Sequence, residues 1–146
     1  MKLEFLELSP EERCLYIDRS FWEKATILHS EYHRPAEKRT VDRFSRHYAD
    51  TASLAQHPTA RAAINQQELR NRVVTWKSRF FGSSWANYEQ AKPGSFRLVP
   101  PAERQPALRR DYEAMRDMYL TEPATFDDIL ATLSDLENRI NQAAKG

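Results

Sequence analysis

Apolar residues recur every three to four positions along most of this 146-residue chain. This spacing is typical of helices that bury one face, and it predicts a mainly α protein of about six helices. We expect the first helix to run from the Ser9 cap to about Ile17, the second to end near His33 and the third to end near His57. The fourth should run from Gln67 to Phe81 and the fifth from Pro106 to Leu120, and the last should carry an apolar stripe from Phe126 to Ile140. Single helical turns are expected at 59–64 and 84–90.

Two helix starts are marked by capping residues. Ser9, Pro10 and Glu12 form a capping box with proline at the first helical position. Thr125 and Asp128 form a second box before the last helix. Both sites therefore predict where a helix begins.

Strand patterns are rare in the chain. Only residues 2–8 and 95–99 alternate apolar and polar side chains as a half-buried strand does. Three glycines, one of them terminal, also argue against a fold of strands and tight turns. We therefore expect a single helical domain over residues 1–146, with at most a short strand or hairpin.

The core is expected along one stripe of each helix. The inward positions are Leu69, Val73, Trp76 and Phe80 in one helix, and Phe126, Ile129, Leu133, Leu136 and Ile140 in the last. Exposed aromatic residues could instead form a platform on which bases stack. The candidates for such a platform are Trp76, Phe80, Phe81, Trp85 and Tyr88, but their helical spacing favours the core.

Composition and charge narrow the class of protein. A net charge of +1 gives no overall attraction to nucleic acid or membrane. The one cysteine, Cys14, cannot form an internal disulfide and fits a reducing compartment. No apolar run is long enough for a membrane span, and the start lacks a signal-peptide pattern. We therefore expect a cytoplasmic protein without a membrane partner.

Most polar residues that could act together lie between Arg19 and Asp50. Lys24 lies on the rim of an apolar stripe, where its stem can be buried while its ammonium reaches a cleft. On the next helix, the side opposite the buried one carries Arg43, Arg46, His47 and Asp50. Spacing alone also fits a solvated helix face, since an Arg46–Asp50 pair would contribute only about 0.3–0.5 kcal/mol.

Other candidates for metal or phosphate binding are weak. His29 and His33 are four residues apart, but no third ligand is obvious, so we interpret His29 as a core histidine with one hydrogen bond. Gly82-Ser83 is interpreted as a helix stop, and Asp127-Asp128 as charge at a helix N-terminus. No complete metal site is predicted in this chain.

Roughly residues 19 to 141 resemble one known family. The longest matching segments are FWEKATILHSEYHRP and RFSRHYAD, and they are followed in order by WK, FF, WANY, AKPGSFRLVP, DY, FDDI and LENRIN. Together these segments resemble AbiEii/AbiGii-type abortive-infection nucleotidyltransferase toxins of bacterial toxin–antitoxin systems. The resemblance implies transfer of a nucleotidyl group from a nucleoside triphosphate, with Mg²⁺, to an acceptor such as RNA.

The resemblance also implies roles for particular residues. Lys24 looks like the catalytic lysine that steadies the phosphates, and Asp50 looks like the late catalytic aspartate. Asp50 would orient Lys24, help with metal, or act as a base toward the acceptor. Arg43, Arg46 and His47 would support this pair or bind phosphate. If so, the ends of Lys24 and Asp50 should lie within about 10 Å of each other.

The family pattern includes parts that this chain does not show. A Gly-Ser or Gly-Thr turn and an Asp-x-Asp pair should precede residue 19, where the chain has no room for them. We therefore expect the helical C-terminal half of such an enzyme, which binds neither Mg²⁺ nor triphosphate tightly and is inactive alone. Expected partners are the missing N-terminal half, a cognate antitoxin and an RNA acceptor. The alternative is a non-enzymatic interaction module or a truncated remnant.

Overall fold

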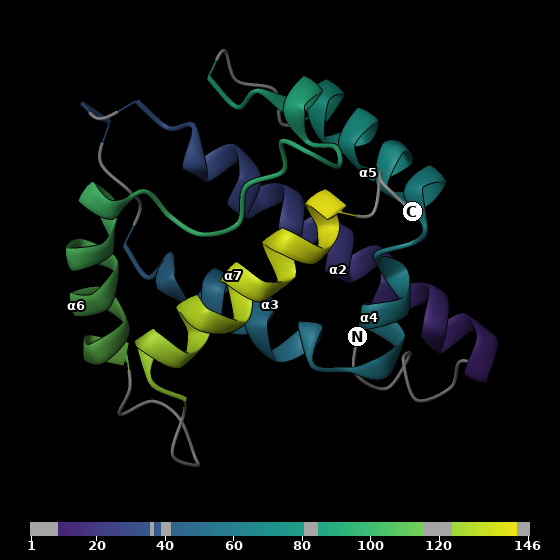
Figure 1. Cartoon of the computed structure of the whole chain (residues 1–146), viewed down its shortest axis with the longest axis horizontal. Helices are drawn as coiled ribbons and strands as arrows, with labels where there is room; N and C mark the ends of the chain where they lie inside the picture. The colour runs from purple at the N-terminus through teal and green to yellow at the C-terminus, as the bar shows by residue number, and fades with distance from the viewer. Residues whose placement is uncertain (1–8, 36, 39–41, 81–84, 116–123, 143–146) are drawn as a thin grey trace.

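The structure is a computed structural model that describes residues 9–35, 37–38, 42–80, 85–115 and 124–142 (Figure 1). Its α-helices are α2 (Pro10–Tyr32), α3 (Ser45–Ala55), α4 (Pro58–Ala63), α5 (Gln67–Phe80), α6 (Gln105–Met115) and α7 (Phe126–Gln142), and its 3-10 helices are η1 (Tyr88–Gln90) and η2 (Ala102–Arg104). The described ranges contain no strand, which confirms a mainly α fold. The strand considered for residues 2–8 lies outside them.

Helix α2 corrects one expectation, because a single helix of 23 residues replaces the two predicted between Ser9 and His33. The predicted capping box is present: the Glu12 amide donates to Ser9 Oγ, and the Ser9 amide donates to Glu12 Oε1, both at 3.2 Å. No proline or glycine lies between Ile17 and Tyr32, so nothing in that stretch stops the helix.

The helices pack around α2 and α3. Helix α2 contacts α3, α4 and α5, while α3 also contacts α6 and α7. Figure 1 shows α7 lying across α3, with α5 and α6 on opposite sides of the molecule. The largest fully buried side chains are Phe21, Trp22, Leu28, Tyr48, Phe96, Leu98, Tyr112, Phe126, Leu133 and Ile140. One core therefore includes residues from α2, α3, α6 and α7.

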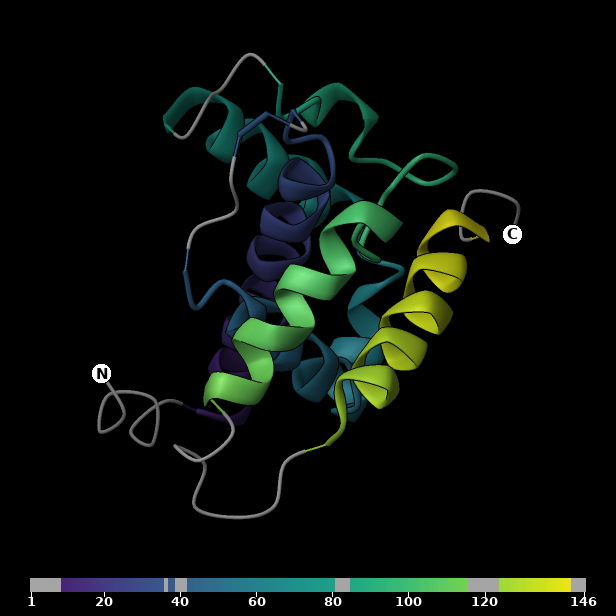
Figure 2. The same ribbon diagram turned by 90° about the vertical axis from the view of Figure 1, so that its left-hand side faces the viewer.

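The expectation of a strand at residues 95–99 is wrong. This segment is extended, but side chains of α7 bind its backbone in place of a neighbouring strand. Asn141 Oδ1 accepts from the Gly94 and Phe96 amides at 3.0 and 2.9 Å, and its Nδ2 donates to the Phe96 carbonyl. Glu137 accepts from the two amides at residues 98 and 99. The segment is thus held to α7, as Figure 2 allows the reader to follow.

The predicted orientation of α5 is only partly confirmed. Val73 is buried, but Trp76 and Phe80 are 40% and 66% exposed, so assigning both to the core was wrong. Only α2 and η1 make substantial contact with α5 among the described elements, and α5 lies at the edge of the molecule in Figure 1. Its buried stripe is therefore narrower than its apolar stripe. The proposed stop at Gly82 lies outside the described residues.

The last helix follows its prediction closely. All five expected core positions of α7 are buried. The Asp128 amide donates to Thr125 Oγ1 at 3.1 Å, which gives the first half of the expected capping box. Helix α4 and η1 occupy the places of the two predicted helical turns. For α6, the described part ends at Met115 and the remaining predicted residues lie outside it.

Candidate functional site

Lys24 and Asp50 come together from two different helices. The Lys24 Nζ atom lies 3.7 Å from Asp50 Oδ2, which confirms their predicted proximity. The side chains are 33% and 52% exposed, so solvent and solutes can reach both. Packing of α2 against α3 creates this pair, because the two residues are far apart in sequence.

His47 lies beside this pair and is half-buried. Burial lowers its pKa, and the positive charges of Arg46 and Lys24 lower it further, while Asp50 and Glu31 oppose the shift. Its Nδ1 atom is buried without a hydrogen-bond partner. His47 is therefore held neutral at neutral pH, in the field of both members of the pair.

Arg46 is placed differently from the expected helix pair. It is exposed on α3, and Asp50 forms its ion pair with Lys24, whereas none joins Asp50 to Arg46 within the described part of the chain. The idea that Arg46 holds Asp50 in place is therefore not supported by a direct contact. The positive charge of Arg46 nevertheless contributes to lowering the pKa of His47.

Arg43 lies at the start of α3, where Asp111 of α6 binds the backbone. Asp111 accepts from the Arg43 amide at 2.8 Å, from the Ser45 amide at 3.0 Å and from the Ser45 hydroxyl. Burial opposes ionisation, but these hydrogen bonds and the Arg43 charge lower the pKa of Asp111. The carboxylate therefore caps α3 from another helix. Sequence reasoning named Asp111 within the family pattern but assigned it no role.

Helix α5 adds a second lysine to the cluster. Burial lowers the pKa of Lys77, and the charges of Glu23 and Lys24 act on it in opposite directions. Lys77 belongs to the WK segment of the family pattern, but sequence reasoning assigned it no role, because nothing in its local spacing connects it with α2. The charged groups around Lys24 thus come from three helices rather than two, and we call Lys24, His47, Asp50 and Lys77 the α2–α3 cluster.

A hollow of about 310 Å³ opens on the other side of Asp50, between α3 and α7. Small and polar side chains predominate in its lining: Ala49, Asp50, Ala52, Ser53, Gln56, Tyr112, Ala124, Asp128, Ile129 and Thr132. Among the described residues, the lining includes two carboxylates and no lysine or arginine. It is therefore better suited to hydrogen-bond donors than to phosphates, and Asp50 stands between it and Lys24.

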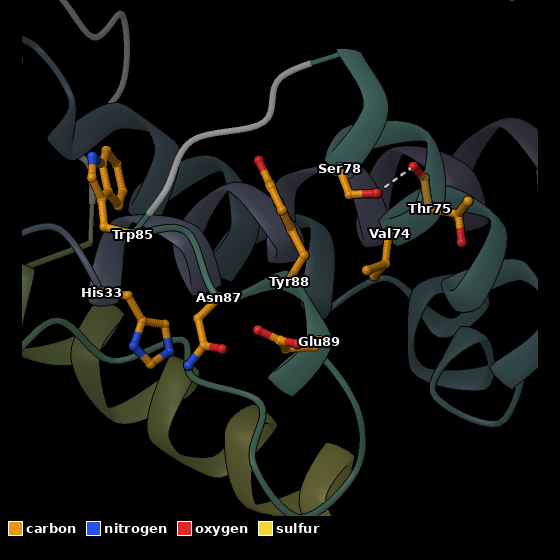
Figure 3. Close-up of a pocket in the computed structure, with 8 residues that line it drawn as sticks. All are labelled: His33, Val74, Thr75, Ser78, Trp85, Asn87, Tyr88 and Glu89. Atoms are coloured by element: carbon orange, nitrogen blue, oxygen red, sulfur yellow. Dashed lines mark hydrogen bonds between the residues drawn. The ribbon is translucent and has the colours of Figure 1, made fainter.

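A larger hollow of about 720 Å³ lies between α5 and the segment around η1 (Figure 3). Its lining residues are His33, Val74, Thr75, Ser78, Trp85, Asn87, Tyr88 and Glu89. Its described lining residues include none of the α2–α3 cluster and no lysine or arginine. A triphosphate, which needs positive charge, fits this hollow poorly.

The expected reaction implies a site for Mg²⁺. Mg²⁺ prefers carboxylates and water in an octahedral arrangement. No group of three or more His, Cys, Asp or Glu side chains able to hold a metal occurs in the described ranges. Asp50 alone does not make such a site, so these residues do not fit a complete Mg²⁺ centre.

The fold and the cluster define a mainly α domain with a solvent-accessible lysine–aspartate pair between packed helices. The family model for the nucleotidyl transferase AbiEii toxin of type IV toxin–antitoxin systems matches residues 2–132. The chain belongs to this family, which supports a role of the nucleotidyltransferase type in a toxin–antitoxin system. No curated protein and no solved structure shows significant similarity to it. No described helix is both long and apolar enough to span a membrane.

Proposed function

We propose that Lys24 and Asp50 act together in nucleotidyl transfer from a nucleoside triphosphate to an acceptor hydroxyl, such as one on RNA. The observation that carries this proposal is the 3.7 Å separation of two partly exposed, opposite charges in a chain of a nucleotidyltransferase family. Ion pairs with this exposure contribute only about 0–1 kcal/mol, so a phosphate can compete with Asp50 for the ammonium.

Lys24 provides the positive charge for the phosphates. A lysine ammonium is a compact charge on a flexible stem, which suits charge that develops during transfer. Lys77 and Arg46 add positive potential near it, and Arg43 adds more at the start of α3. This arrangement favours an anionic substrate at the α2–α3 cluster even though the whole chain carries a net charge of only +1.

Asp50 is the candidate proton acceptor. In the reaction, the acceptor oxygen forms a bond to the α-phosphorus, the bond from that phosphorus to the bridging oxygen breaks, and pyrophosphate leaves. The acceptor proton passes to Asp50, whose carboxylate is accessible from solvent. Movement of Lys24 to the phosphates releases Asp50 for this role.

The N-terminal half of the family enzyme and a cognate antitoxin are the proposed partners. The described residues supply one carboxylate at the α2–α3 cluster and no complete metal site. The family pattern assigns metal binding to an Asp-x-Asp pair that the 146-residue chain lacks. We therefore propose that the 146-residue chain is inactive alone and becomes active with a chain that supplies that half.

The test is transfer of labelled nucleotide to RNA. The purified chain should give no product with magnesium and each of the four triphosphates, and addition of the missing half should give product. Lys24→Ala or Asp50→Ala should then reduce the rate by a factor of about 10² or more without unfolding the chain. Lys92→Ala and Asp135→Ala, which remove exposed charges elsewhere, should leave the rate unchanged.

Two results would contradict the proposal. Robust transfer by the 146-residue chain alone would mean that the catalytic centre lies elsewhere. Full activity of the Lys24→Ala and Asp50→Ala variants with the added half would show that the pair does not take part, and would favour a non-enzymatic interaction module. Circular dichroism of each variant separates loss of function from loss of fold.

A further inference from the structure

Helix α5 exposes two neighbouring aromatic rings. Trp76 and Phe80 are the large apolar side chains that stay exposed in the described ranges. Their ring centroids are 5.2 Å apart, and the ring planes are tilted by 39°. The two rings form a narrow apolar ridge along one side of α5, which we call the α5 ridge.

Two exposed arginines, Arg72 and Arg79, flank the α5 ridge. The other basic residues of α5 are the buried Arg70 and the half-buried Lys77, and the one acid of the helix is Glu68. Arg72, Arg79 and Glu68 line a hollow of about 420 Å³ together with both rings. Glu68 pairs with Arg72 at 3.2 Å, but both side chains are largely exposed, so this pair is weak. The helix is therefore much more basic than the chain as a whole.

We propose that the α5 ridge binds single-stranded nucleic acid. Bases would stack on Trp76 and Phe80, while Arg72 and Arg79 would meet the flanking phosphates. Exposed aromatic rings beside a basic surface are the combination by which proteins bind single strands with little sequence preference. Arginine can also stack on bases, which adds to the attraction.

A protein partner fits this ridge less well. Stable protein interfaces bury about 800 Å² on each side and have cores depleted of charge. The α5 ridge is two rings wide and has arginine on its flanks. A polyanion that offers flat rings matches both features, whereas an apolar protein surface would have to desolvate the arginines.

The ridge shares helix α5 with Lys77 of the α2–α3 cluster. Lys77 follows Trp76 in sequence, and its charge interacts with Glu23 and Lys24 on α2. A single strand held by Trp76 and Phe80 would thus lie on the same helix as Lys77. This inference extends the proposed function by giving a nucleic-acid acceptor a docking surface, but the binding itself needs neither triphosphate nor magnesium.

The experiment measures fluorescence anisotropy of a labelled oligouridylate of about 12 nucleotides, without triphosphate or magnesium. Phe80→Leu should weaken binding at least about fivefold, whereas Phe80→Trp should preserve it, because stacking needs a ring rather than an apolar surface. Arg79→Gln should weaken binding and reduce the slope of log affinity against log salt by about 0.7. The matched control is Arg139→Gln, which removes an exposed arginine from α7 and should change neither quantity.

The proposal is overturned if the wild-type chain does not bind the oligonucleotide, if Phe80→Leu binds as well as wild type, or if Arg139→Gln weakens binding as much as Arg79→Gln. Equal affinity for a duplex would also exclude stacking on exposed bases. Self-association by sedimentation that disappears in Phe80→Leu would show that a second copy covers the ridge, and would overturn the proposal too. Because no triphosphate is present, failure here leaves the transfer test of Lys24 and Asp50 intact.

Discussion

His29 connects α2 to the segment on either side of η1, and its protonation should destabilise the fold. The side chain is fully buried. Its Nε2 lies 2.9 Å from the Asn87 carbonyl oxygen, and its Nδ1 accepts from the Arg97 amide at 3.1 Å. A carbonyl can only accept and an amide can only donate, so the ring must be neutral with its proton on Nε2. The expectation of a core histidine is confirmed, with two hydrogen bonds instead of one.

The surroundings oppose a positive charge on this ring. Burial is the largest cause and lowers the pKa of His29 to about 4. The hydrogen bond to Asn87 opposes the shift, while the neighbouring His33 ring and the Arg97 charge add to it. Protonation of Nδ1 would also break its hydrogen bond with the Arg97 amide.

The sign and size of the pH effect follow from this shift. The folded pKa of His29 lies below the value of 6.5 expected for an unfolded chain. The unfolded state therefore binds the proton first, and stability that is present above about pH 6.5 is lost as the pH falls toward 4. Between about pH 7.5 and 5, the linkage relation gives a loss of roughly 2 kcal/mol from this residue alone.

The assay is urea unfolding of the wild-type chain and of His29→Gln at these two pH values. Wild type should lose about 2 kcal/mol more than the variant on acidification, because glutamine does not titrate. An equal loss in wild type and His29→Gln would refute the reasoning. If His29→Gln does not fold, an NMR titration of the His29 ring in wild type gives the same answer, and an ordinary pKa would refute it.

Two further predictions concern side chains that bind backbone in another element. Asp111→Ala removes the acceptor for the Arg43 and Ser45 amides. This change should lower the free energy of unfolding, measured in urea, by about 2 kcal/mol. A decrease of less than about 0.5 kcal/mol would show that α3 does not need this cap. Asn141→Ala removes three hydrogen bonds to Gly94 and Phe96. It should lower the free energy of unfolding in urea by about 2–3 kcal/mol. An unfolding midpoint equal to that of wild type would mean that packing of Phe96 alone holds the segment.

Helix positions could be predicted from sequence because they depend on local properties. The apolar stripe of α7 and the Ser9 capping box depend on residues that are close together in sequence, and both predictions are confirmed. The junction near Ile17 was misjudged because a change in pattern was taken for a break, although no helix-breaking residue is present there. The extended segment at 95–99 has the alternation of a strand, but its backbone amides bind the side chains of Glu137 and Asn141 in place of a neighbouring strand, and both residues are distant in sequence.

Exposure and long-range partners could not be predicted in the same way. Trp76 and Phe80 have the spacing of core residues, but no described helix covers them, and periodicity carries no information about which neighbours arrive. Asp111 of α6 caps the start of α3, and Lys77 of α5 adds its charge to the α2–α3 cluster; only the packing of the chain reveals both. By contrast, Lys24 and Asp50 could be selected by resemblance to a family, and their catalytic role stays a prediction.

The setting of Lys24 and Asp50 favours movement of side chains over movement of helices. Lys24 precedes the buried Ala25 on α2, and Asp50 precedes the buried Thr51 on α3, so both backbones are held by the core. The start of α3 is fixed further by Asp111. The outer atoms, in contrast, are partly exposed and joined only by a 3.7 Å ion pair. Exchange of Asp50 for a phosphate on Lys24 therefore needs only rotation of a lysine side chain, at a cost of about 1–2 kcal/mol in side-chain freedom. This combination of fixed backbones and mobile side-chain ends is consistent with the proposed transfer, in which the acceptor would meet the Asp50 carboxylate after Lys24 has moved to the phosphates.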